Sequence, residues 1–201
     1  MAHNYPHLVK LEDASKKFNL PSYSSNMCGN KLCEILIATI TADKTNSAPQ
    51  VYLSGALHGD ERVGPVAVTQ FIEYLLSNYE TDPEVKQLLN EREIIVTPMT
   101  NADGYYRKSR TELNDQKWSI DINWDFPFNR LDNACFSSLA ARVVSKIFTE
   151  NIIVGCLTYH GGTETISYPW GSFNHIGKKA NDEAPDFKMF DEISIVLWTQ
   201  S

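Results

Sequence analysis

The sequence has few cysteines, no long hydrophobic run and no excess of basic residues, and each shortage excludes a class of protein. Four cysteines in 201 residues are too few for a disulfide-dense scaffold. No stretch approaches the roughly 20 consecutive apolar residues of a membrane-spanning helix. Lys and Arg number 18 against 25 Asp and Glu, a net charge of −7. A nucleic-acid-binding surface, which needs clustered Lys and Arg, is therefore not expected.

Two other features leave the compartment open. The first residues, MAHNYPHLVK, lack the basic and then apolar pattern of a signal peptide, but secretion stays compatible with an incomplete N-terminus. Cys28 and Cys33 flank GNKL and could close a small loop in an oxidising compartment. Cys135 and Cys156 could also pair, and the sequence does not decide between a disulfide and free thiols.

The composition and the hydrophobic periodicity predict a folded α/β protein. The chain is 42% hydrophobic and 21% charged, which is ordinary for a globular domain, and its length suits a single domain spanning residues 1–201. Apolar segments alternate between strand-like and helix-like periods. Strands are expected at 33–40, 50–57, 93–99 and 152–159, helices at 64–79, 82–89, 136–148 and from about 185, and a polar loop at 101–133. This order predicts a mixed, mostly parallel sheet with helices on both faces.

Histidines stand at the ends of two predicted strands. The strand 50–57 ends at His58, and the strand 152–159 ends at His160. In open α/β sheets, ligands bind beyond the carboxyl ends of the strands. The remaining histidines (His3, His7 and His175) have no strand end beside them. His58 and His160 are therefore the candidates for chemistry.

A carboxylate three residues after the first histidine suggests a metal site. Catalytic zinc takes three protein ligands from His and Asp/Glu and keeps one position open. His58 and Glu61, in a tight turn, can point at one ion, and His160 is the obvious third ligand. The alternative is a pair of hydrogen-bonded loop histidines with Glu61 as a solvated charge. Two His–Gly strand ends together with the His-x-x-Glu spacing favour the metal site, without naming a reaction.

Four sequence blocks, in order, make most of the chain resemble the zinc carboxypeptidase family (peptidase family M14). HGDE resembles the first zinc motif, His-x-x-Glu, and TNADGYYRKSR resembles the Asn-Pro-Asp-Gly-Tyr block with its downstream arginine. IDINWDFPF resembles Asp-Leu-Asn-Arg-Asn-Phe-Pro, and TYHGGT followed by SYPWG resembles the segment of the third zinc ligand. The resemblance implies a carboxypeptidase-like α/β fold and one Zn²⁺ ion bound by His58, Glu61 and His160.

The same resemblance implies roles for other residues. Arg107 or Arg110 matches the catalytic arginine that stabilises the oxyanion, and Arg110 fits the family pattern better. Asn123 matches the asparagine that hydrogen-bonds the terminal carboxylate of the substrate. Asp121 is expected to orient the loop or a metal ligand.

The chain departs from the family pattern in two places. Trp124 stands where the family has the arginine that clamps the substrate carboxylate, and an indole cannot replace a guanidinium fork. Asp125 is expected to add a negative charge nearby. The family's catalytic glutamate lies well beyond the third zinc ligand, and neither Glu183 nor Glu192 lies in the matching block. The domain is therefore expected to be incomplete at the C-terminus, and its beginning also looks clipped.

The function expected from these residues is that of a zinc metallocarboxypeptidase that acts on peptides or proteins, with this chain inactive or impaired. A non-catalytic zinc-binding relative that acts as an interaction module is one alternative. A zinc deacylase of the aspartoacylase type, which shares a His-Gly-x-Glu turn, is another. The preferred C-terminal side chain and the oligomeric state are not readable from the sequence.

Overall fold

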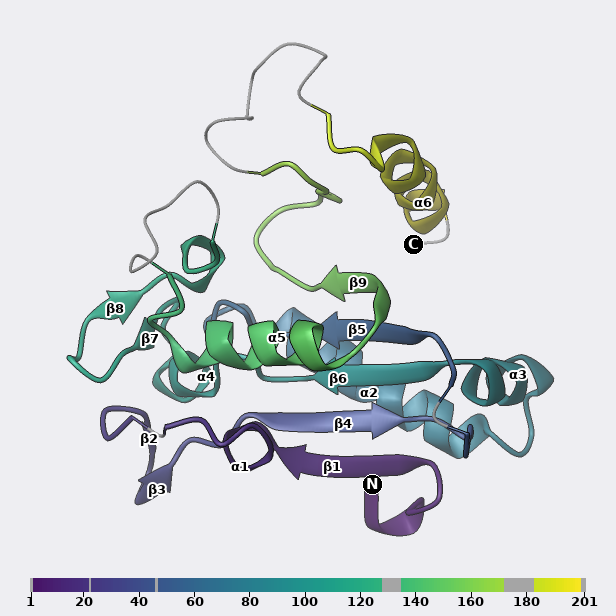
Figure 1. The fold of residues 1–201 in the computed structure, drawn as a ribbon, viewed down its shortest axis with the longest axis horizontal. Coiled ribbons are helices and arrows are strands. Elements are labelled where there is room, and N and C mark those ends of the chain that lie inside the picture. Colours follow the sequence, from purple (N-terminus) through teal and green to yellow (C-terminus); the bar gives the residue numbers. More distant parts are fainter. Residues whose placement is uncertain (1, 22, 46, 128–134, 172–182, 200–201) are drawn as a thin grey trace. The chain divides into compact units, whose positions relative to one another are not determined.

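The chain divides into two compact units, residues 1–161 and 162–201. The computed structural model describes residues 2–21, 23–45, 47–127, 135–171 and 183–199 (Figure 1). The first unit contains the sheet and every candidate ligand, and the second contains one long helix. The expectation of a single domain over 1–201 stays a prediction.

A five-stranded sheet in the order β1-β4-β6-β5-β9 forms the centre of the first unit. The central strand β6 pairs in parallel with β5, which pairs in parallel with β9, whereas β4 is antiparallel to both of its neighbours. Four of the five strands thus run in one direction, which confirms the predicted mixed, mostly parallel sheet. The strands are β1 (Val9–Asp13), β4 (Leu36–Ile40), β5 (Gln50–Ser54), β6 (Glu93–Thr97) and β9 (Ile153–Thr158).

Helices cover both faces of this sheet (Figure 1). Alternate residues of a strand point to opposite faces of the sheet, so one strand contributes side chains to two hydrophobic cores. Ile37 of β4 packs in the core that includes Ile147 of α5 (Leu139–Glu150), together with the short helix α1 (Ala14–Lys17). Its neighbour Ala38 belongs to the core beneath α2 (Val63–Asn78) and α3 (Pro83–Glu91).

The helix starts follow local capping chemistry. Asp82 caps α3 by accepting hydrogen bonds from the backbone N–H of Glu84 (2.9 Å) and Val85 (3.4 Å), as its sequence predicts. The helix predicted from residue 136 begins later, at Leu139, because Phe136 has a positive φ of 57° and Ser138 is the N-cap. The strand predicted over 50–57 ends at Ser54, because Ala56 takes a left-handed φ of 48°.

The region predicted as a loop, 101–133, contains regular structure up to residue 127. It holds the helix α4 (Ala102–Arg107), the hairpin of β7 (Glu112–Leu113) and β8 (Ser119–Ile120), and the 3₁₀ turn η2 (Ile122–Trp124). Residues 128–133 of that prediction lie outside the described residues. These elements are too short to give a hydrophobic period, which explains why the sequence did not reveal them.

The N-terminal part holds elements that the sequence analysis did not predict. The 3₁₀ turn η1 (Ala2–Asn4) precedes β1, and a small hairpin pairs β2 (Met27–Cys28) with β3 (Lys31–Leu32). Cys28 and Cys33 form a disulfide at this hairpin. Cys135 and Cys156 are both free thiols, so the second possible disulfide is not formed.

The second unit contains the helix α6 (Phe187–Thr199), in agreement with the predicted C-terminal helix. Tyr168 packs on Phe187 and Phe190 within this unit, and its hydroxyl donates a hydrogen bond to Asp191 (3.1 Å). Among the described residues, none of the helices combines the length and the apolar character needed to cross a bilayer.

Candidate metal centre

The three predicted ligands meet at the carboxyl edge of the sheet. His58 and Glu61 follow β5, and His160 follows β9. These two strands are parallel neighbours, with Ser54 opposite Thr158, and the backbone N–H of Tyr159 still bonds the Ser54 carbonyl oxygen at 2.8 Å. Because the strands end in register, the loops that leave them begin side by side. Residues separated by a hundred positions are thereby brought together.

The Glu61 carboxylate lies between the two imidazoles. Its Oε1 is 2.8 Å from His58 Nδ1, and its Oε2 is 2.9 Å from His160 Nδ1. Oε2 also accepts a hydrogen bond from the backbone N–H of Gly161 at 3.0 Å. The two imidazole rings lie with centroids 4.8 Å apart. His58 is almost fully buried, whereas the His160 side chain is 37% exposed, so the group opens towards solvent on one side.

This donor set fits a divalent metal. One ligand atom from each of His58, Glu61 and His160 lies within 4.8 Å of the other two, near the roughly 3–4 Å spacing of ligands around one ion. Two imidazole nitrogens and a carboxylate oxygen are zinc ligands of the catalytic type, and they leave a fourth position for water.

Asp121 orients His58. Its Oδ1 lies 3.1 Å from His58 Nε2, the ring nitrogen that does not face Glu61. Its Oδ2 accepts a hydrogen bond from Arg110 Nε at 2.8 Å. In metal sites, a carboxylate on the far nitrogen fixes the tautomer and the ring position of a ligating histidine, so that the other nitrogen, here Nδ1 on the Glu61 side, can bind the ion. The structure thus places Asp121 behind His58, as an orienting residue.

The charges of the site lower the pKa of both carboxyl groups. Burial alone would raise the pKa of Glu61, but the hydrogen bond and charge of His58, followed by those of His160, hold it below the ordinary value. Burial would also raise the pKa of Asp121, but the hydrogen bonds and charges of Arg110 and His58 outweigh it. The pKa of Asp121 is therefore lowered as well. Both groups therefore stay ionised at neutral pH, as a cation-binding site requires.

Gly59 allows the turn from His58 to Glu61, called the metal turn below, to pack closely against α4. A Cβ at this position would overlap the backbone of Gly104 and Tyr105. The Gly59 N–H donates to the carbonyl oxygen of Arg110 at 3.3 Å, and the Asn101 side chain donates to the same oxygen at 3.1 Å. Only glycine fits the turn, and the backbone of Arg110 is fixed by two hydrogen bonds beside the metal ligands.

The two candidate arginines occupy different environments. Arg107 forms a bidentate ion pair with the buried Asp103, at 2.9 and 2.6 Å, and also bonds the Thr111 carbonyl oxygen. Arg110 is half-exposed, with one terminal nitrogen 3.7 Å from Glu61. The structure therefore places Arg110, and not Arg107, beside the candidate metal ligands. Asp103 was missed in the sequence, although the i,i+4 spacing on a helix could have indicated this pair.

The residues expected to bind a substrate carboxylate lie in and after η2. Asn123 is exposed, and its backbone N–H bonds Asp121 Oδ1 at 3.1 Å. Trp124 is partly buried. Asp125 is buried, and it accepts hydrogen bonds from the backbone N–H groups of Ser137 (2.9 Å) and Ser138 (2.7 Å) ahead of α5. Its carboxylate therefore lies at the start of α5, and the effect of its charge on substrate binding stays a prediction.

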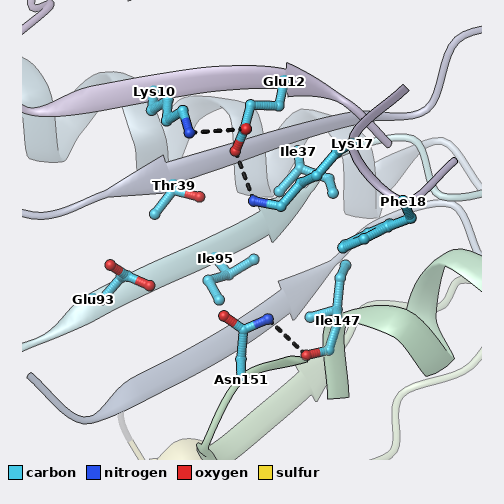
Figure 2. Close-up of a pocket in the computed structure, with 10 residues that line it drawn as sticks. All are labelled: Lys10, Glu12, Lys17, Phe18, Ile37, Thr39, Glu93, Ile95, Ile147 and Asn151. Carbon is cyan, nitrogen blue, oxygen red and sulfur yellow. Dashed lines mark hydrogen bonds and ion pairs between the residues drawn. The ribbon is translucent and has the colours of Figure 1, made fainter. Parts of the chain in front are cut away.

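A separate cavity of about 200 Å³ lies beside α5, against β1, β4 and β6 (Figure 2). Its two lysines already have a partner, since Glu12 pairs with both Lys10 (2.9 Å) and Lys17 (2.7 Å). None of the candidate metal ligands lines it. This cavity is therefore not part of the candidate metal centre.

The fold and the site define an α/β protein with a His-Glu-His group that could bind a metal at the carboxyl edge of its sheet. The family model of the zinc carboxypeptidases matches residues 29–197. The chain belongs to the zinc carboxypeptidase family.

This chain spans less than half of the length of the relatives that follow. Carboxypeptidase D of Drosophila melanogaster is 27% identical over 83% of this chain and 13% of its own length. The inactive metallocarboxypeptidase ecm14 of Schizosaccharomyces pombe is 25% identical over 77% of this chain and 35% of its own. The solved carboxypeptidase A of Helicoverpa armigera, at 19% identity and a TM-score of 0.75, covers 97% of this chain, which spans 49% of that structure. This last likeness establishes the fold alone.

Proposed function

We propose that His58, Glu61 and His160 hold one zinc ion, and that the site is that of a zinc-dependent carboxypeptidase that removes C-terminal residues from peptides or proteins. The observation that carries this proposal is the meeting of three ligands from two strand ends, with ligand atoms within 4.8 Å of one another. The membership in the zinc carboxypeptidase family supports the choice of metal and of reaction.

Each surrounding residue has a task in this proposal. When bound, zinc lowers the pKa of a water molecule and polarises a carbonyl group. Asp121 keeps His58 in the tautomer that offers Nδ1. Arg110 presents a guanidinium at the open side of the site, where a donor to a developing oxyanion contributes roughly 3 kcal/mol to transition-state stabilisation.

The proposed site should bind the free C-terminal carboxylate of a peptide only weakly. Asn123 offers an exposed amide to the substrate carboxylate. Trp124 supplies one N–H donor and an apolar face in place of a fork of two N–H donors. We therefore propose that ordinary peptides bind weakly and that this chain is impaired as an enzyme.

A non-catalytic zinc-binding protein is the second candidate function. The similarity to a fungal relative described as inactive favours it, as does Trp124. A deacylase of the aspartoacylase type ranks below both, because the family model that matches is that of the zinc carboxypeptidases.

Trp124→Arg is expected to tighten the binding of a peptide with a free C-terminus by about tenfold, because a guanidinium fork can bind the terminal carboxylate. The measurement compares the zinc-loaded wild type and variant on one peptide in its free-acid and amidated forms. The gain should be confined to the free acid. Lys117→Arg, at an exposed position on the β7–β8 turn, is the matched control and should change nothing.

Two outcomes would decide against parts of this proposal. Tight zinc binding without turnover of any peptide, in both the wild type and Trp124→Arg, would establish the non-catalytic candidate. Equal gains on the acid and the amide would show that the residue at position 124 does not meet the substrate carboxylate.

A further inference from the structure

A groove runs along α2, outside the candidate metal centre. Three adjoining cavities, of about 380, 230 and 130 Å³, form it. Met99 lines all three, Tyr105 lines the first two, and Thr69 lines the last two, so the cavities share walls. We call this surface the α2 groove. An elongated surface of this kind suits a chain-like ligand better than a compact one.

One end of the α2 groove is basic. Lys31, Arg62 and Lys108 line it, against a single carboxylate, Glu34. Lys31 and Lys108 are exposed and form no ion pair within the described residues. Arg62 stacks on the ring of Tyr105 at 3.7 Å and donates to its carbonyl oxygen, so its guanidinium is held at this end. In a chain of net charge −7, this local positive charge favours an anionic partner.

The other end of the α2 groove is apolar. Ala38, Ile72, Leu76, Pro98 and Met99 line it, together with Leu11, which is 52% exposed. Thr69 and Gln70 lie in the section between the two ends and offer hydrogen-bonding groups in the middle. Exposed apolar side chains next to hydrogen-bonding ones are typical of surfaces that bind peptide segments.

The basic end adjoins the metal turn. Arg62 directly follows Glu61, and the Gly59 backbone packs on Gly104 and Tyr105, whose helix forms one wall of the groove. The hairpin with the Cys28–Cys33 disulfide forms the opposite wall, and the Cys28 sulfur lies 3.7 Å from the Ala102 carbonyl oxygen. Figure 1 shows α4 and this hairpin at the same end of the sheet. The wall that closes the basic end is thus covalently braced.

We propose that the α2 groove binds an extended peptide segment, with acidic residues at the Lys31–Arg62–Lys108 end and apolar side chains at the Leu11–Leu76 end. The charge of the basic end selects the acidic residues, and the apolar lining takes the side chains beyond them. None of the candidate zinc ligands lines the groove, so this binding is independent of the proposed hydrolysis.

The test uses a fluorescent peptide in which three glutamates lie next to a run of leucine and valine, acetylated and amidated so that it has no free terminus. Anisotropy titrations with zinc-free protein report its affinity. The double variant Lys31→Glu/Lys108→Glu should weaken binding at least about tenfold. Leu11→Glu should weaken it several-fold by disrupting the apolar end. All three positions are exposed, so the variants should keep the melting temperature of the wild type.

The matched control is Lys86→Glu/Lys117→Glu, which changes the net charge equally at exposed positions away from the groove and should leave the affinity unchanged. No binding by the wild type, equal weakening by the control, or undiminished binding by Leu11→Glu would each overturn the proposal. Because zinc is absent and the peptide is blocked, a failure of the proposed hydrolysis leaves this result unaffected.

Discussion

His160→Ala is expected to reduce bound zinc from one ion per chain to none after dialysis. The substitution removes one of the three proposed ligands, so it should cost more than the roughly 10–100-fold loss of affinity seen when a residue behind a ligand is removed. The His160 side chain is 37% exposed and leaves no buried cavity, so folding should be preserved. Zinc per chain by mass spectrometry, together with a thermal melt, measures both effects.

His7→Ala is the matched control for this prediction. His7 is exposed and lies near the N-terminus, away from the strand ends that carry the ligands. It should retain one zinc per chain. Retention of one zinc by folded His160→Ala would remove His160 from the ligand set.

As the pH rises to about 7, protonated Glu112 should lose its contribution of about 3 kcal/mol to the free energy of unfolding of the wild type. The variant Glu112→Gln is expected to abolish this loss. Burial raises the pKa of Glu112 from 4.5 to about 7, although N–H groups of Ala140, Leu139 and Asn26 donate to it. The folded state therefore holds the proton more tightly than the unfolded chain does. This stabilisation is fully present below about pH 4.5 and is lost as the pH rises through 7, and the shift corresponds to about 3 kcal/mol.

Urea unfolding at several pH values between 4.5 and 7.5 measures this difference. Glutamine resembles the protonated carboxyl group and does not titrate, so the stability of the variant relative to the wild type should rise across this window. Glu73→Gln, at an exposed position of α2, should keep a constant difference from the wild type. A constant difference for Glu112→Gln as well would show that Glu112 titrates as an ordinary carboxyl group.

The parts of the fold that the sequence predicts are those with long hydrophobic periods or strong caps. The strands β5, β6 and β9 and the helices α2, α3 and α5 all lie within a few residues of their predicted ranges. The strand β1 was missed because three of the five residues of VKLED are charged, as suits an edge strand, and among the described residues it pairs with β4 alone.

The group formed by His58, Glu61 and His160 could be predicted because these residues follow apolar strands, which is a local feature of the sequence. Its surroundings depend on contacts that have no local signal. Asp125, just after η2, bonds the backbone of Ser138 at the start of α5. Glu112 of β7 is buried where it accepts hydrogen bonds from Leu139 and Ala140 of the same helix. Such packing is set by the tertiary structure, which a single sequence does not display.

The most direct test of the metal centre is zinc K-edge X-ray absorption on the wild-type chain loaded with one equivalent of zinc. A site made by His58, Glu61 and His160 predicts only nitrogen and oxygen neighbours, at about 2.0–2.2 Å, with the scattering pattern of two imidazole rings. Sulfur at about 2.3 Å, which Cys135 or Cys156 would supply, or fewer than two imidazoles would contradict it.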